Sequence, residues 1–199
     1  MTWWMKARAV QRLAAAVVLT IALGILLGDT ALPIPILTGQ SGAFLAGHLL
    51  TVIPAVVLMS GQERTDRRIE ATATRPVNRW DACLGGAAAL IVTAASGLLY
   101  LGLGSDMAVV SGRNIAAYIG IALFLAAFLG PRISAFLTTL LPLGLAHTGW
   151  TPSGKAEFWA WLLHEANSIT AIAATVAILG AGCVSLWLRR NPIQRKALR

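Results

Sequence analysis

The residues best suited to chemistry lie in two polar stretches, 60–81 and 147–167, that interrupt an otherwise apolar chain. Within the second, residues 149–155 read Gly-Trp-Thr-Pro-Ser-Gly-Lys and spell most of a phosphate-binding loop. A working loop needs a Ser or Thr after the lysine to coordinate Mg²⁺, and a buried strand before it. Ala156 follows the lysine and no such strand is predicted, so we expect no ATPase in this chain.

The three histidines and the few acidic residues form no catalytic or metal-binding pattern. His48 falls inside a predicted span, where we interpret it as bonded to a neighbouring helix. His147 and His164 lie near a membrane interface, and no pair at i, i+4 spacing has a third ligand. Glu165 beside His164 is interpreted as part of a polar rim. We therefore predict no catalytic residue, no metal site and no cofactor within this chain.

The first stretch, Ser60–Asp81, holds five of the sixteen basic residues and four of the eight acidic ones. Thr65–Thr74 contains no Gly or Pro, so a short helix is possible there. Arg75 precedes a proline, which disfavours the helical conformation and ends that helix. Pro76 suits the first turn of the next helix. The stretch therefore predicts a surface helix joined to a spanning helix by a stiff corner; the alternative is a solvated loop that binds anionic lipid.

The rest of the composition is typical of a polytopic membrane protein. Of the 199 residues, 57% are hydrophobic and only 12% are charged, against roughly a quarter charged in soluble domains. Long apolar runs without alternation predict helices rather than a barrel. We expect an all-α fold with about six transmembrane helices in a single domain, residues 1–199. The predicted spans are residues 13–27, 41–59, 82–103, 115–129, 133–145 and 169–188.

Charge predicts the orientation of these spans. With six spans and both termini in the cytoplasm, fourteen of the sixteen Lys and Arg residues lie inside, and only Arg113 and Lys155 lie outside. This distribution explains the net charge of +8 better than nucleic-acid binding does. The basic arm, residues 1–12, with the first span could be a signal peptide, but the weak cleavage site favours an uncleaved anchor.

An outer turn, a broken span and an outer interfacial helix are also predicted. Residues 104–114 form an outer turn, and Pro142 breaks the fifth span. Between the fifth and sixth spans, Phe158, Trp161 and Leu162 recur at helical spacing, which predicts an amphipathic helix in the outer interface.

The stretch between the second and third spans resembles the permease subunits of type-2 ABC transporters, the ABC exporter family. The family pattern is a Glu, five intervening residues, and Pro-Val-Ser-Arg opening the third span. Here Glu70 stands six residues before Pro76, and Pro76-Val77-Asn78-Arg79 follows. The chain departs from the pattern in having Asn78 for the Ser and Arg67-Arg68 for a Gly-Thr pair.

The resemblance implies a transmembrane permease subunit in the bacterial inner membrane, with Thr65–Thr74 as a cytoplasmic coupling helix. A cytosolic ATPase subunit that binds ATP and Mg²⁺, and a second permease copy or a paralogue, are the implied partners, besides membrane lipid. Because the spans contain no clear Asp or Glu, the expected cargo is hydrophobic or amphipathic, such as a peptide, an antibiotic or a lipid-like molecule. The predicted ATPase contacts are Arg64, Arg67, Arg68, Glu70 and Arg75, with Pro76 and Arg79 setting the corner.

Two other hypotheses remain open. The chain could be a non-transporting immunity, assembly or sensor subunit that binds a cytosolic partner through the same basic face. It could also be a membrane-embedded enzyme, although no catalytic set supports that.

Overall fold

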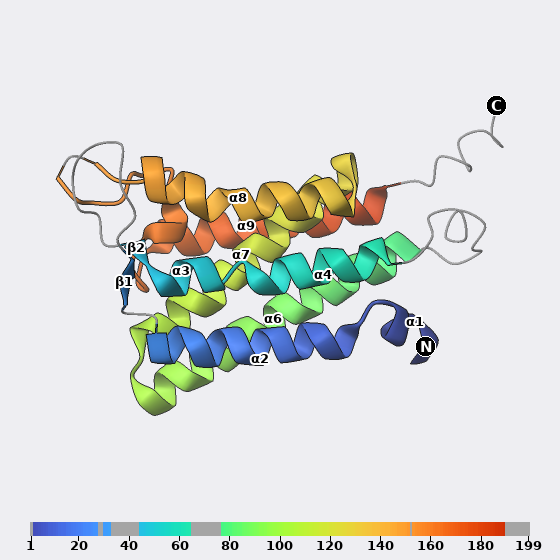
Figure 1. The fold of residues 1–199 in the computed structure, drawn as a ribbon, viewed down its shortest axis with the longest axis horizontal. Helices are drawn as coiled ribbons and strands as arrows, with labels where there is room; N and C mark the ends of the chain where they lie inside the picture. The colour runs from blue at the N-terminus through green and yellow to red at the C-terminus, as the bar shows by residue number, and fades with distance from the viewer. Residues whose placement is uncertain (1, 28–29, 33–43, 65–76, 152, 190–199) are drawn as a thin grey trace.

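The computed structural model describes residues 2–27, 30–32, 44–64, 77–151 and 153–189. These residues form a bundle of helices aligned along one axis (Figure 1). The helices are α1 Thr2–Ala7, α2 Val10–Leu27, α3 Ala46–Leu50, α4 Ile53–Glu63, α6 Val77–Leu103, α7 Asp106–Leu129, α8 Pro131–Thr148 and α9 Ile169–Leu188. A 3-10 turn, η1 Trp161–Leu163, and a short antiparallel ribbon, β1 Ala31–Leu32 with β2 Phe44–Leu45, complete the described elements. The predicted all-α class is confirmed.

Four of the helices, α2, α6, α7 and α9, are long and apolar enough to cross a membrane. A span of the hydrocarbon core needs about 20 apolar residues, and these helices have 18 to 27. The predicted spans 41–59 and 133–145 correspond to α3 with α4, and to α8. Both lie along the same axis as the four (Figure 1), but α3 and α4 are short, and α8 carries Arg132, Pro142 and His147.

The apolar side chains on the outer faces of these helices support a lipid environment. Exposed large apolar residues on α2 include Val18, Leu19 and Leu26, and those on α9 include Ile169, Val176 and Leu188. On α6 the corresponding residues are Leu90, Ile91, Leu98, Leu101 and Leu103. In water such faces would be an aggregation hazard, whereas lipid tails cover them at no cost. The chain therefore has the character of a membrane-embedded protein.

Helix α7 is the centre of the bundle, because fifteen of its 24 residues are buried. It meets α9 at two glycines. A Cβ on Gly182 would come within 2.3 Å of the Gly120 carbonyl oxygen, and a Cβ on Gly120 would lie 2.7 Å from the Leu179 backbone. On the other side, the Ser134 hydroxyl of α8 donates to the Ala122 carbonyl of α7 at 2.6 Å. Small residues and helix-to-helix hydrogen bonds are the usual means of holding spanning helices together.

The bundle has two chemically different ends. One end, which we call the basic end, contains α1, the ends of α4 and α9 and the starts of α6 and α8 (Figure 1). The opposite end, the ribbon end, contains β1, β2 and the loop 149–168. Seven of the nine described Lys and Arg residues lie at the basic end, namely Lys6, Arg8, Arg12, Arg64, Arg79, Arg132 and Arg189. Arg113 and Lys155 lie toward the ribbon end.

Two sequence predictions at the helix ends are wrong. The predicted outer turn 104–114 is helical from Asp106 onward, because Gly104, with φ +65°, completes the reversal in two residues. The predicted break at Pro142 is absent: α8 is continuous from Pro131 to Thr148. Neighbouring helices tolerate a proline in a spanning helix because they compensate for its missing hydrogen bond, and Pro142 is buried.

The predicted outer amphipathic helix is also wrong. The described residues of the loop 149–168 contain only η1 and a single bridge between Trp150 and Ala156. Phe158 is 84% exposed, whereas Leu162 is buried. The carbonyls that a helix would use internally are instead hydrogen-bonded by side chains of α7, so the segment folds as a packed loop.

The contact between α7 and α9 gives a direct test. We expect Gly182→Ala to lower the midpoint of thermal unfolding in detergent by several degrees, because overpacking a close helix contact costs about 1–3 kcal/mol. Gly180→Ala on the same helix is the matched control, since a Cβ there meets nothing within 4 Å. Equal midpoints for the two variants would contradict the predicted contact.

Candidate functional site

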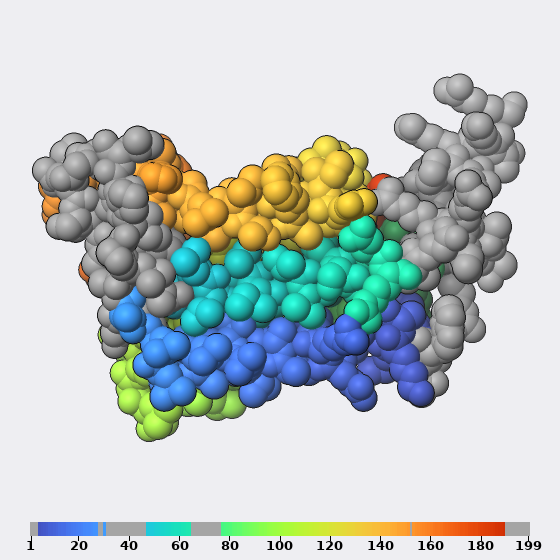
Figure 2. All heavy atoms as spheres, viewed as in Figure 1, coloured from blue at the N-terminus to red at the C-terminus, as the bar shows by residue number. Residues whose placement is uncertain are grey.

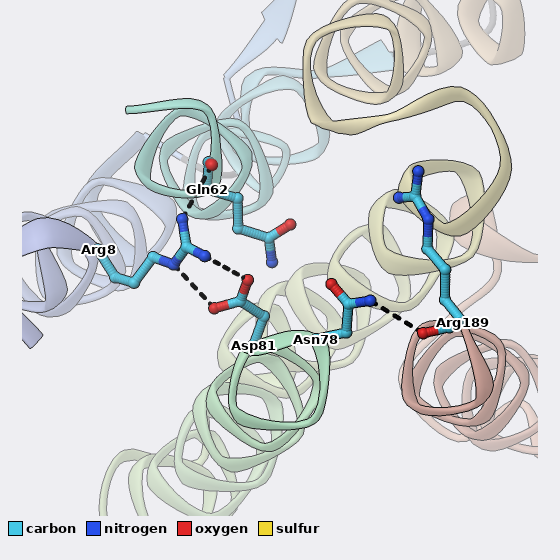
Figure 3. Close-up of polar contacts among 5 residues, drawn as sticks. All are labelled: Arg8, Gln62, Asn78, Asp81 and Arg189. Atoms are coloured by element: carbon cyan, nitrogen blue, oxygen red, sulfur yellow. Dashed lines mark hydrogen bonds and ion pairs between the residues drawn. The ribbon is translucent and has the colours of Figure 1, made fainter. Parts of the chain in front are cut away.

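A buried ion pair at the basic end joins the N-terminal arm to the start of α6. Arg8 lies between α1 and α2, where Ala9 adopts φ +50° and turns the chain. Its Nε donates to Oδ1 of Asp81 at 2.9 Å and its Nη2 donates to Oδ2 at 2.8 Å (Figure 3). The two side chains are only 2% and 6% exposed. This two-point geometry is the strongest form of an arginine–carboxylate pair.

The same guanidinium also holds the end of α4. Nη1 of Arg8 donates to the Gln62 carbonyl at 2.9 Å (Figure 3). The backbones approach closely as well, because a Cβ on Gly61 would come within 2.4 Å of the Arg8 carbonyl oxygen. One side chain therefore connects three segments: the α1–α2 corner, the last turn of α4 and the first turns of α6. We call Arg8, Gln62 and Asp81 the corner cluster.

The start of α6 is tied on its other side to the ends of α7 and α9. The Asn78 amide donates to the Arg189 carbonyl at 3.0 Å (Figure 3), and Nη1 of Arg189 donates to the Ala126 carbonyl at 2.8 Å. The Arg79 guanidinium lies over the Trp187 ring, 5.2 Å from its centroid. The start of α6 is thus bonded directly to Arg8 and to the end of α9. Through Arg8 and Arg189 it is also linked to α4 and α7.

These contacts lie on both sides of residues 65–76, which were predicted to hold the coupling helix. That segment, with Arg67, Arg68, Glu70, Arg75 and Pro76, lies outside the described residues. Arg64 and Arg79, the two predicted contact residues that the structure describes, are exposed at the basic end. The corner cluster joins the helices from which this segment departs and to which it returns.

Sequence reasoning missed the corner cluster. Arg8 was interpreted only as a marker of orientation, and Asp81 only as one charge of the polar stretch. A signal was present, because Asp81 directly precedes a long apolar run and an acid there needs a partner. The sequence does not show which arginine is that partner, because Arg8 lies 73 residues before Asp81 and is positioned by the turn between α1 and α2.

The ribbon end has a second buried polar group, centred on α7. Arg113, expected outside the membrane as a loop residue, is buried and donates to the Glu165 and His164 carbonyls at 2.8 and 2.6 Å. Asn114 donates to the Leu162 carbonyl at 2.8 Å. These bonds fasten the loop 149–168 over the bundle.

His164 takes part in this packing. Within the described residues, the His164 ring bonds to the Glu157 carbonyl and the Ser168 hydroxyl, each at 3.1 Å. His48, in α3, is buried. Among the described residues no three His, Cys, Asp or Glu side chains are grouped to hold a metal ion. We take the corner cluster as the candidate site, because its side chains connect three segments of the bundle.

Comparison of the chain with known proteins identifies no family or relative. No protein-family model matches it, and neither a curated protein nor a solved structure gives a significant match.

The buried ion pair predicts a strong effect on stability. We expect Arg8→Ala to destabilise the bundle by about 3–5 kcal/mol, because it leaves the Asp81 carboxylate buried without its partner. Thermal unfolding in detergent is the measurement. Lys155→Ala, which removes an exposed cation toward the ribbon end, is the control and should change the midpoint little.

A double-mutant cycle separates the pair from other effects of the substitution. Asp81→Ala alone should also destabilise, but the Arg8→Ala/Asp81→Ala double variant should lose less stability than the two single losses added together. Additive losses would mean that the two side chains do not depend on one another.

Proposed function

We propose that this chain is the transmembrane permease subunit of an ATP-driven type-2 ABC exporter, resident in the bacterial plasma membrane. Six helical segments cross the bilayer in this proposal: α2, α3 with α4, α6, α7, α8 and α9. An even number of crossings agrees with the positions of α1 and the end of α9 at the same end of the bundle (Figure 1). The cation-rich basic end then faces the cytoplasm, as the loop charge rule requires.

The observation that carries the proposal is the corner cluster. A motor outside the membrane can move a bundle only if the segment it grips is rigidly attached to the spanning helices. The segment 65–76 is attached at Glu63–Arg64 and at Val77, and both attachment points adjoin helices that Arg8 holds together. A force on the segment therefore reaches α2, α4 and α6 at once.

In the proposed mechanism, cytosolic ATPase subunits bind the coupling helix, Thr65–Thr74, through Arg64, Arg67, Arg68, Glu70 and Arg75. Their closure on ATP pushes the corner at Pro76 and Arg79 and tilts α6. Because α6 packs on α7 and α9, the bundle moves as a body against a second permease copy or a paralogue. The cargo passes at that interface and is hydrophobic or amphipathic, since apolar side chains dominate the outer faces of the spanning helices.

The second candidate is a non-transporting immunity, assembly or sensor subunit. The basic end favours it equally, because exposed cations there would bind an acidic cytosolic partner with or without ATP. It differs in requiring no ATPase and no movement of the bundle.

Charge reversal in the coupling segment tests the proposal. We expect Arg67→Glu/Arg68→Glu to abolish co-purification of an ATPase subunit with the tagged chain from its native membrane, and to remove the associated ATP hydrolysis. The ATPase is identified by mass spectrometry from a complete phosphate-binding loop. The control, Arg132→Glu/Lys155→Glu, changes the net charge equally and should retain the complex.

Two results would reject the transporter. The first is a wild-type complex that contains no ATPase, which favours the second candidate. The second is equal ATPase recovery from the charge-reversed and control variants, which removes the coupling segment from the interface.

Cysteine labelling tests the orientation. In a chain with Cys83 and Cys183, both free, replaced by Ser, an impermeant maleimide applied to intact cells should modify Lys155→Cys. It should modify Glu70→Cys only after the membrane is permeabilised. Labelling of position 70 from outside would place the basic end on the wrong side for any ATPase.

A further inference from the structure

A hollow at the α1–α2 corner is lined by three basic side chains. It has a volume of about 480 Å³ and its lining includes Lys6, Arg12 and Arg64, with Ala9, Val10 and Ala14 beneath them. Figure 2 shows the surface indented where α1 turns into α2. The N-terminus of α2 opens into the same space and adds its positive dipole. We call this space the basic hollow.

The described acidic groups at this end are engaged away from the hollow. Of the described acids there, Asp81 is bonded by Arg8 and Glu63 lies 3.8 Å from the Arg132 guanidinium on α8. Lys6, Arg12 and Arg64 are exposed and make no ion pair within the part of the chain that the structure describes. Three cations therefore converge on a space that no acidic side chain lines among the described residues.

An apolar groove continues from the basic hollow into the membrane region. It lies between α2 and α6, has a volume of about 210 Å³, and is lined by apolar residues alone, among them Leu13, Val17, Leu84, Ala88 and Ile91. Val10 and Ala14 line both spaces. The two spaces therefore adjoin at the first turns of α2, the hollow lined by cations and the groove by apolar side chains.

We infer that this site binds one anionic phospholipid, with its phosphate in the basic hollow and an acyl chain in the groove. Lysine and arginine clusters beside spanning helices attract anionic headgroups, and the apolar lining of the groove suits an acyl chain. A zwitterionic lipid would leave the three cations without net compensation, and a free anion would leave the groove unfilled. The inference stands independently of the proposed transport function.

The position of the site gives the lipid a structural role. Its headgroup contacts the α1–α2 corner and the end of α4, and its chain lies between α2 and α6. These are the segments that Arg8 joins from the inside. A bound anionic lipid therefore fastens the corner from the outside and should stabilise the folded bundle, as any ligand of the native state does.

Native mass spectrometry of the delipidated full chain tests this inference. We expect phosphatidylglycerol to bind at least tenfold more tightly than phosphatidylcholine of the same chain length, and to raise the thermal midpoint. Each cation contributes about fivefold, so Lys6→Gln/Arg12→Gln/Arg64→Gln should remove most of the preference. The control, Arg79→Gln/Arg132→Gln/Lys155→Gln, removes three charges elsewhere and should keep it.

A second pair of variants tests the groove without changing charge. Ala14→Phe fills the junction of hollow and groove and should weaken phosphatidylglycerol binding at least tenfold. Ala15→Phe, the next residue, is equally exposed and lines neither space, so it should bind as the wild type does. Inorganic phosphate at millimolar concentration should not displace the lipid.

Three outcomes would overturn the inference. Equal binding of the two lipids, or equal losses in the two triple variants, would mean that the hollow does not select charge. Wild-type phosphatidylglycerol affinity in Ala14→Phe, or displacement by phosphate, would show a surface anion site with no place for an acyl chain. If the triple variant does not fold, phosphatidylglycerol binding by Ala14→Phe and Ala15→Phe still tests the inference.

Discussion

A guanidinium buried against a carboxylate has to keep that partner, because separating the two leaves a charge without water or a counter-ion. In this chain that constraint acts between Arg8 and Asp81, residues 73 positions apart, and extends to Gln62 through a third donor. A hydrophobic contact could slide along a helix, but a two-point ion pair fixes register. The pair therefore determines how the N-terminal arm, α4 and α6 meet at the basic end, and every functional proposal starts from that meeting point.

Other close contacts hold the rest of the bundle together. Glycines 120 and 182 let α7 and α9 come into backbone contact, and α7 is enclosed on several sides. At the far end, Arg113 and Asn114 fasten the loop 149–168 to α7 by binding its carbonyls. Both ends of the bundle are thus held by arginine side chains that donate to backbone or carboxylate oxygens. Between the ends the helices pack through an apolar core that combines large side chains, such as Tyr118 and Met59, with close contacts at glycines.

The sequence predicted much of the fold, because bilayer thickness and apolar run length leave few alternatives. The helices predicted at 13–27, 82–103, 115–129 and 169–188 are present, and all four end at the predicted residue. The first three begin earlier than predicted, and the fourth begins where predicted. The prediction failed where side chains far away in the sequence bind backbone groups that the local pattern had assigned to a helix. Phe158, Trp161 and Leu162 have helical spacing, yet Asn114 and Arg113 capture the carbonyls that a helix would need. Arg113 was predicted to be a solvated loop charge. Its burial depends on the loop 149–168, whose position the sequence did not show.

Composition and order along the chain therefore determined that these helices are apolar, roughly where each lies in the sequence, and at which end the cations gather. Those properties follow from local hydropathy and from charge bias, which need no knowledge of neighbours. Tertiary structure alone decided which arginine pairs with Asp81, which arginine closes the outer loop, and which three cations are left facing a common hollow. The reason is physical: a buried charge is satisfied by whichever partner the packed backbone brings within about 3 Å, and no local pattern in the sequence encodes that distance.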